Sequence, residues 1–411
     1  MNHIYTGLDI GNGEIKVVVV NVDNTNNKYH VLAATSVKTS GLKKNTIYDD
    51  KKLKNSILNA IKLTEEKLEM KIKEVILTLP ANRASMTIES GLVNIRDERV
   101  KGKDIEAVIN DTVANTYDDT RELVSCLPIS FTVDEEASVI NPLGENGEKL
   151  FLKAVVATSP KEEIYPFINL VRSIGINITD IIYNTQGDYY TVATKELDRK
   201  MGVIINVGAD ITSIGIFNKG IMIKNSYLPV GSSSVDKDIA FIYKVDLKEA
   251  RKLKETFALT SSRYADSNDS ISIINKENKK ITINQKQISE VIESRIKEIL
   301  KLAKNEINRL TKREISYIIV VGGISELAGF NYVVEETLGR LSNCFNMREI
   351  GIRHNKYTSA FGACKYFAKE CVLKEKNINM FNTDEINNFI SPKKKNINSD
   401  NMTNKFFGHF F

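Results

Sequence analysis

The sequence has few cysteines and histidines, and neither type is clustered. The four cysteines, Cys126, Cys344, Cys364 and Cys371, form no Cys-x-x-Cys pair, and their spacing fits neither a zinc site nor a disulfide framework. We therefore expect buried, reduced thiols in a cytosolic protein. The four histidines are scattered along the chain, so none of them is assigned a catalytic or metal-binding role.

Long apolar runs and a strong charge of one sign are also missing. No stretch approaches the roughly eighteen continuous apolar residues of a membrane-spanning helix, and the N-terminus leads straight into a strand pattern. The formal net charge of +5 is small for 411 residues. We expect a soluble, cytoplasmic chain that binds no nucleic acid and touches a membrane only peripherally.

Two similar stretches, residues 4–20 and 202–217, lie about two hundred residues apart. Each runs from an apolar β-branched segment into Asp or Asn, a hydrophobic residue and a glycine-centred turn, and then into a second apolar segment. This pattern predicts a β-hairpin. A single copy is more often only an ordinary tight turn. Two copies favour a duplicated architecture whose halves present phosphate loops from opposite sides of a cleft.

The polar tips of these hairpins supply the candidate binding residues. Glycine permits positive φ and leaves backbone N–H groups open to an anion. Asp9 is suited to hold hydrated Mg²⁺ through water, and Lys16 can place its ammonium near a phosphate. The candidates are Asp9, Gly11, Asn12, Gly13 and Lys16 in the first hairpin, and Asn206, Gly208, Ala209, Asp210 and Thr212 in the second.

A third stretch, residues 317–327, is a buried-strand run that ends in two adjacent glycines, Gly322 and Gly323. The glycine pair would let a flat ring or a phosphate lie against the backbone, and Ser325 is placed to open a helix. An ordinary strand-to-helix turn is the alternative for this stretch alone. The three loops together favour a nucleotide cleft.

The order of these loops resembles the actin/Hsp70/sugar-kinase ATPase fold, and other stretches narrow the resemblance to the FtsA family of bacterial cell-division proteins. Those stretches are residues 76–81, 127–134, 140–147, 228–231, 235–240 and 247–254. The resemblance covers roughly residues 4–372. It implies an α/β, actin-like (ribonuclease H-like) duplicated ATPase fold with a small α+β inserted subdomain and a disordered C-terminal tail.

The resemblance also implies a division into domains. These are 1–84 with 161–197 (first half), 85–160 (insert), 198–240 with 301–372 (second half), 241–300 (smaller subdomain), 373–403 (flexible linker) and 404–411 (membrane-targeting tail). In the family, the insert is associated with filament contacts and later division proteins, although it could merely cap the core. The resemblance implies that the surface that meets FtsZ lies roughly in residues 241–300.

A long helix is predicted over residues 286–310, and it brings Arg295 and Glu298 to one face at three-residue spacing. The resemblance places these two residues at the adenosine moiety of ATP. Glu298 can accept from ribose hydroxyls, and Arg295 can stack on the base. A surface ion pair on the helix is the alternative.

The second phosphate loop departs from the usual family form, Asp-x-Gly-Gly-Gly-Thr-Thr-Asp. Asn206 replaces the first carboxylate, and Asp210 adds a negative charge where a turn glycine would meet the phosphates. We predict binding of ATP and Mg²⁺ with slow or absent hydrolysis. Whether the chain is an enzyme stays open, and no residue is assigned a catalytic role.

The core pattern ends near Leu373, and a polar segment leads to four phenylalanines, Phe406, Phe407, Phe410 and Phe411. Their spacing puts them on one side of a helix that can insert at a bilayer interface. Family members end similarly. The aromatics could instead dock into a pocket on a protein.

The resemblance implies a scaffold that polymerises and tethers FtsZ filaments to the cytoplasmic face of the cell membrane at the division site. Two alternatives have the same fold. One is a divergent assembly ATPase of another structure, such as a pilus. The other is a small-metabolite kinase, which would need a catalytic Asp and a substrate-binding insert, and no such motif stands out.

Overall fold

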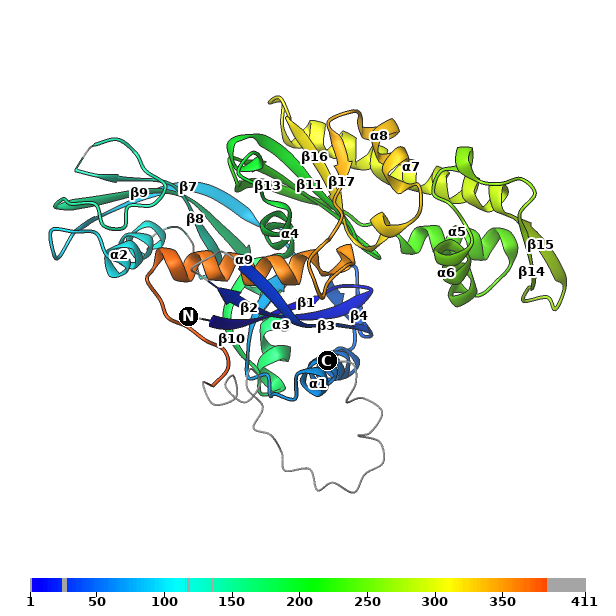
Figure 1. Cartoon of the computed structure of the whole chain (residues 1–411), viewed down its shortest axis with the longest axis horizontal. Helices are drawn as coiled ribbons and strands as arrows, with labels where there is room; N and C mark the ends of the chain where they lie inside the picture. The colour runs from blue at the N-terminus through cyan, green and yellow to red at the C-terminus, as the bar shows by residue number, and fades with distance from the viewer. Residues whose placement is uncertain (1, 24–27, 115, 117–118, 135, 383–411) are drawn as a thin grey trace, which may run out of the picture.

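The chain forms two similar α/β halves, seen in a computed structural model that describes residues 2–23, 28–114, 116, 119–134 and 136–382. One half lies below the other in Figure 1, and the long helix α9 (Thr358–Leu373) runs between them. An inserted subdomain projects at one end of the molecule, and the smaller subdomain of the second half lies at the opposite end.

The first half is built on a five-stranded sheet of order β10-β6-β1-β2-β3. The strands are β1 (Asn2–Ile10), β2 (Glu14–Asp23), β3 (Lys28–Lys38), β6 (Glu74–Leu79) and β10 (Asn177–Tyr183). The valine run 17–20 favours a strand covered on both faces, and these side chains are fully buried. Helices α1 (Asp50–Leu68) and α3 (Lys161–Ser173) cover one face, and α9 packs on β1, β2 and β6.

The second half has a sheet of order β13-β12-β11-β16-β17. The strands are β11 (Met201–Val207), β12 (Thr212–Asn218), β13 (Ile221–Leu228), β16 (Tyr317–Val321) and β17 (Ser342–Cys344). Helix α4 (Asn184–Val192) connects the two sheets, while α7 (Gln285–Leu310) and α8 (Phe330–Leu338) pack against the second one.

The two sheets share one topology. In each, three antiparallel strands are followed by two strands that pair in parallel, so β1, β2, β3, β6 and β10 correspond to β11, β12, β13, β16 and β17. The hairpins β1–β2 and β11–β12 therefore occupy equivalent places. This confirms the duplicated α/β architecture predicted from the two glycine-centred hairpins.

The insert is an α+β unit, and its described residues form a three-stranded sheet of order β7-β9-β8 and one helix. Its elements are β7 (Ser85–Asn94), α2 (Gly102–Val113), β8 (Arg121–Val133) and β9 (Lys149–Pro160). Helix α2 packs closely on β7 because Gly91 carries no side chain; an added Cβ would lie 2.5 Å from Thr112 Oγ1. The insert has its own apolar core, which includes Val108, Phe131 and Leu152.

The smaller subdomain of the second half contains α5 (Ser233–Tyr243), α6 (Leu247–Thr256), η2 (Ser262–Tyr264) and the hairpin β14 (Ser270–Ile274) with β15 (Lys280–Asn284). This hairpin lies within the polar stretch 260–284. Short elements complete the chain: β4 (Leu42–Lys43), β5 (Thr46–Ile47), η1 (Leu197–Arg199), η3 (Gly323–Glu326) and η4 (Asn355–Tyr357).

The segment that follows α9 is packed, whereas the sequence places it in a flexible linker. Met380 N donates to Ile4 O at 3.2 Å, and Met380 and Phe381 are buried against the first half. Parallel pairing of β6 with β1 spans Gly7–Asp9, so the start of β1 has an edge along which this segment can lie. The expected linker beyond residue 382 and the four tail phenylalanines lie outside the described residues.

Candidate functional site

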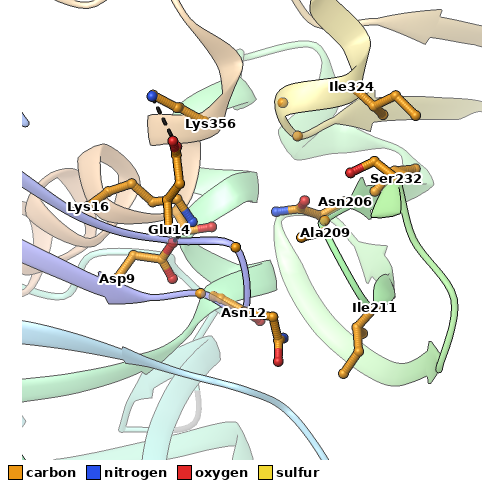
Figure 2. A pocket seen from close by; sticks show the side chains of 18 of the residues that line it. Asp9, Asn12, Glu14, Lys16, Asn206, Ala209, Ile211, Ser232, Ile324 and Lys356 are labelled. Atoms are coloured by element: carbon orange, nitrogen blue, oxygen red, sulfur yellow. Dashed lines mark hydrogen bonds and ion pairs between the residues drawn. The ribbon is translucent and has the colours of Figure 1, made fainter. Parts of the chain in front are cut away.

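A cavity of about 450 Å³ lies between the two halves, beyond the ends of β1, β11 and β16. Figure 2 shows side chains of the hairpin β1–β2 on one side of it and Asn206, Ala209 and Ile211 on the other. Clefts at the carboxyl ends of strands are the usual ligand sites of α/β folds, and this volume suits a small organic ligand.

The structure brings most of the predicted site residues to this one cavity. Those that line it are Asp9, Gly11, Asn12, Gly13, Lys16, Asn206, Gly208, Ala209, Gly322 and Gly323. Asp210, Thr212, Arg295, Glu298 and Ser325 are not among the lining residues. The three glycine loops, separated in sequence by about one hundred residues or more, therefore share one crevice.

In the first hairpin, Asp9 and Lys16 face each other across the β1–β2 ladder. Lys16 Nζ lies 2.8 Å from Asp9 Oδ2, and Thr78 Oγ1 donates to Asp9 Oδ1 at 2.8 Å. Gly11 allows this approach because an added Cβ would stand 2.5 Å from Lys16 Nζ. The hairpin thus presents one ammonium and one carboxylate in fixed positions at the cavity wall.

In the second hairpin, the residue equivalent to Asp9 is Asn206, and Ser213 stands opposite it in place of a lysine. Asn206 Nδ2 donates to Asp188 Oδ2 at 2.7 Å. The turn is closed by Gly208 N, which donates to Ile211 O at 2.9 Å. Gly208 O accepts in turn from Ser232 N at 2.9 Å, so the loop before α5 supports the hairpin tip.

The two hairpin tips approach each other closely. A Cβ added at Gly13 would lie 2.8 Å from the Ala209 Cβ. The small residues at both tips therefore leave backbone groups near the middle of the cavity. Such a backbone-lined gap is typical of a site for an anion.

The third loop carries the glycine pair. Gly322 has a φ of +103°, and an added Cβ would come within 2.6 Å of Val207 O, so glycine is required there. At Gly323 the nearest atom to an added Cβ is His354 Cε1 at 3.7 Å, which leaves the backbone accessible from the cavity.

The prediction that Ser325 opens a helix is wrong. Residues Gly323–Glu326 form the 3₁₀ turn η3, and α8 begins later, at Phe330. The helix starts there because Gly329 adopts a φ of +81° and turns the chain. Ser325 Oγ instead donates to Gly322 O at 2.7 Å and accepts from Asn355 Nδ2 at 2.7 Å, which braces the glycine loop.

Helix α6 contributes cavity residues that the sequence analysis missed: Arg251, Lys254 and Glu255. Lys254 is buried and lies 2.6 Å from Asp236 Oδ1, while Arg251 Nε lies 3.3 Å from Asp236 Oδ2. One carboxylate thus holds both cations at the cavity wall. The sequence feature that could have indicated them is the cluster of charged residues at helical spacing in 247–254.

Arg295 lies on α7, where Asp238 Oδ2 is 2.5 Å from its Nε and Asp238 Oδ1 is 3.0 Å from its Nη2. Its Nη1 donates to Glu298 Oε2 at 2.5 Å. Both residues are thus engaged in an ion-pair cluster between α5 and α7. Thr212 is also engaged elsewhere, since its hydroxyl donates to Val230 O at 2.9 Å.

Lys356 links the third loop region to the first hairpin. Its Nζ lies 3.0 Å from Glu14 Oε2, the ion pair drawn in Figure 2, and it donates to Ser36 Oγ at 2.7 Å. His354, two residues earlier, also lines the cavity, and burial lowers its pKa. We therefore expect a neutral imidazole at pH 7.

Behind the cavity wall, Asp188 is fully buried on α4, and burial raises the pKa of its carboxyl to about 6. Hydrogen bonds from Thr358, Asn206 and Ser359 act in the opposite direction. The carboxyl is consequently ionised for the most part at pH 7. These three partners, all within the described residues, are neutral side chains.

Two negative findings apply to the described residues. No group of three or more histidine, cysteine, aspartate or glutamate side chains is arranged to hold a metal ion. In the same part of the chain, no helix combines the length and apolarity needed to cross a bilayer.

Two protein-family models match the chain. One, described as cell division protein FtsA, matches residues 203–362, and the other, described as the SHS2 domain inserted in FtsA, matches residues 82–158. Together they cover more than half of the chain. The first falls on the second half of the fold, and the second falls on the insert.

Curated relatives named cell division protein FtsA are similar to this chain over most of their length. Cell division protein FtsA of Streptococcus pneumoniae is 24% identical over 366 residues, which are 88% of this chain and 79% of the relative. Cell division protein FtsA of Bacillus subtilis is 22% identical over 383 residues, which are 92% of this chain and 86% of the relative.

Solved structures share the fold at low identity. The PilM-PilN type IV pilus biogenesis complex has a TM-score of 0.58 at 15% identity and covers 89% of this chain and 98% of its own. MreB5 of Spiroplasma citri bound to ADP has a TM-score of 0.54 at 12% identity, covering 91% and 98%. These likenesses concern the fold alone, and they confirm the predicted actin-like architecture. The predicted insert is confirmed by the SHS2 family model.

Proposed function

Because the chain belongs to the FtsA family of cell-division proteins, we propose that it is an actin-like scaffold that binds ATP, polymerises and tethers FtsZ filaments to the cytoplasmic membrane at the division site. One observation carries the nucleotide part of this proposal. Gly11, Gly208 and Gly323, from three separate loops, line the same cavity of about 450 Å³.

The residues present suit a nucleoside triphosphate. Backbone groups at Gly13 and Ala209 flank the narrow gap between the hairpin tips, and Lys16 lines the same wall, so a polyphosphate would meet N–H groups and an ammonium. Arg251 and Glu255 of α6, with Gly323, offer a cation, an acceptor and an open backbone for a nucleoside. MreB5 of Spiroplasma citri, a fold neighbour, was solved with ADP and with AMPPNP.

Mg²⁺ would sit near Asp9, held through water. The Asp9 carboxylate is already engaged by Lys16 and Thr78, which favours an indirect contact over direct ligation. The ion would supply charge neutralisation for the phosphates. Asn206 would add an amide oxygen on the opposite side of the cavity.

We expect ATP hydrolysis to be slow or absent. Asn184 and Asn206, the polar cavity residues from α4 and β11, carry carboxamides, which cannot take a proton from water at neutral pH. The carboxylates of Asp9 and Glu14 are paired with Lys16 and Lys356. Nucleotide would then act as a clamp between the halves.

The polymer, the FtsZ contact and the membrane contact belong to the same proposal. A fold neighbour, MamK, was solved as a double helical filament. We place FtsZ on residues 241–300, where Phe241 and Leu247 are exposed, and later division proteins on the insert. Phe406, Phe407, Phe410 and Phe411 would attach the polymer to the membrane, each tail binding weakly and many tails binding together.

Equilibrium dialysis of the purified full-length chain against ATP with Mg²⁺ tests the nucleotide site, and retention of ATP is expected. Co-sedimentation with FtsZ filaments, with and without ATP, tests the scaffold. Vesicle sedimentation of the full chain and of a chain ending at Asn401 tests the tail. Absence of ATP binding contradicts the cleft, and equal pelleting of both chains contradicts the membrane tail.

A further inference from the structure

Asp188 is a buried carboxylate that lies close to the cavity and has so far been given no role. It lies on α4, does not line the cavity and has no exposed surface. Its Oδ2 accepts from Asn206 Nδ2 at 2.7 Å, and its Oδ1 accepts from Thr358 Oγ1 at 2.6 Å and from Ser359 Oγ at 2.8 Å. It therefore joins α4, β11 and the start of α9.

A buried carboxylate is expected to have a charged or hydrogen-bonding partner, and here these three partners are neutral donors. Two of them, Asn206 and Ser359, line the cavity. The charge of Asp188 thus stands one side chain behind the cavity wall, separated from the cavity by the Asn206 amide.

The duplicated fold offers an internal comparison. At the equivalent place in the first hairpin, Asp9 carries its charge at the cavity wall and is matched by Lys16 on the facing strand. In the second hairpin the wall residue is Asn206, and Ser213 faces it. The carboxylate missing from position 206 is present at position 188, within hydrogen-bonding distance of the amide.

The hydrogen bond also determines how Asn206 is oriented. An ionised carboxylate only accepts, so the amide must turn its NH₂ group toward Asp188. Asn206 Oδ1 then points away from Asp188, and an added Cβ at Gly322 would lie 2.8 Å from it. Gly322 and Asn206 both line the cavity, so the amide presents an acceptor on that side.

We infer that Asp188 is a positioning residue that orients the Asn206 carbonyl toward the nucleotide cavity and supplies the negative charge of the second phosphate loop from behind it. The ligand is Mg²⁺-bound ATP, so this inference rests on the proposed function. The oxygen of Asn206, polarised by the adjacent carboxylate, would accept from a water of the hydrated cation.

The atoms of the pair allow a test by exchange. In the double variant Asp188→Asn/Asn206→Asp, the oxygen of the new amide can still accept from Thr358 and Ser359, and its NH₂ group can donate to the new carboxylate. Asn206→Asp alone places two carboxylates where the hydrogen bond was, which favours protonation of one or separation of both. Asp188→Asn alone removes the charge and frees the amide of Asn206 to rotate.

The experiment measures ATP affinity by equilibrium dialysis, with Mg²⁺ and with EDTA, for the full-length wild type, both single variants and the double variant. The melting temperature of each without nucleotide is measured at pH 7.5. Asp198→Asn is the control, because Asp198 accepts from Tyr189 Oη at 2.7 Å and does not line the cavity. We expect each single variant to bind Mg²⁺-ATP about tenfold more weakly.

The ATP affinity of the double variant should recover to within about threefold of that of the wild type, and Mg²⁺ should again increase it. The double variant should also have a higher melting temperature than Asn206→Asp. The inference is overturned if Asp188→Asn keeps the full Mg²⁺-dependent affinity, or if the double variant is no better than Asn206→Asp in both measurements. If the wild type binds no ATP, the proposed function fails. In that case the melting temperatures test the Asp188–Asn206 pair. If the change in melting temperature of the double variant equals the sum of the two single changes, the inference is overturned.

Discussion

The backbone of Gly362 on α9 lies directly against the carbonyl oxygen of Gly187 on α4, where the two helices that join the halves cross. A Cβ added at Gly362 would overlap that oxygen and would come within 2.8 Å of Thr191 Oγ1. Next to this crossing, Thr191 Oγ1 donates to Thr358 O at 2.6 Å. The crossing is therefore closed by backbone contact as well as by side chains.

Gly362→Ala should destabilise the fold, although alanine is the better helix former by about 1 kcal/mol. The methyl group meets backbone atoms that have no free space to move into, so we expect a loss of about 3 kcal/mol in the free energy of unfolding. Urea denaturation measures it. Lys369→Ala, at an exposed position of the same helix, should change stability by less than about 1 kcal/mol. A more stable Gly362→Ala variant would contradict the packing at this crossing.

Lys16→Met should weaken ATP binding by at least about tenfold, equivalent to about 1.4 kcal/mol, because it removes the ammonium at the first phosphate loop. Equilibrium dialysis with Mg²⁺ measures the change, and the melting temperature reports whether Asp9, left without its cation, disturbs the fold. The control is Lys52→Met, whose partner Asp49 lies on the surface. Wild-type affinity in Lys16→Met would remove this residue from the proposed site.

Arg251→Ala and Arg295→Ala distinguish two places for the adenosine moiety. Arg251 lines the cavity and Arg295 does not, so only the first change should raise the dissociation constant for ATP, by about fivefold or more. Arg295→Ala should instead lower stability slightly, since its partners Asp238 and Glu298 remain partly exposed. If only Arg295→Ala lost ATP affinity, the adenosine moiety would lie beside Arg295, as the family resemblance implies.

Phe241→Ala and Ile242→Ala should reduce co-sedimentation with FtsZ filaments severalfold while leaving stability within about 0.5 kcal/mol of the wild type. Phe241 is 85% exposed and Ile242 is 52% exposed at the end of α5, so neither contributes much to the core. Ile88→Ala is the matched control, because Ile88 is 62% exposed on the insert. Equal co-sedimentation of all three variants would place the FtsZ surface elsewhere.

The buried Asp188 predicts a specific pH dependence of stability. Its pKa is about 6 in the folded chain and near 4 when unfolded, so the folded state holds the proton more tightly. The resulting stabilisation is complete below about pH 4 and is lost as the pH rises through about 6, a change of about 3 kcal/mol. Urea denaturation of the wild type and Asp188→Asn, compared from pH 4 to 8, measures it. The difference in unfolding free energy should fall between pH 4 and 6 and stay level above pH 7, whereas a constant difference would contradict the raised pKa.

Local sequence signals predicted the parts of the site that depend on backbone conformation. Gly11 and Gly208 stand between apolar β-branched segments, and such a pattern specifies a hairpin with little help from distant residues. The same reasoning failed for Ser325. Helix α8 begins after Gly329, and nothing in the sequence near Ser325 shows that the helix starts at the later position. The linker boundary was missed because burial of Met380 and Phe381 depends on the edge of β1, far away in sequence.

Taken by itself, the sequence determined the duplicated hairpins, the glycine pair and the resemblance to FtsA, because each rests on short patterns of residue type and on backbone freedom at glycine. Only the tertiary structure decided which charged groups meet the cavity. Arg251 and Lys254 reach it because α6 packs beside α5, where Asp236 holds them, and Asp188 stands behind Asn206 because α4 packs against β11. Electrostatic partners are set by distances in space, and these distances follow from how helices and sheets pack rather than from neighbours along the chain.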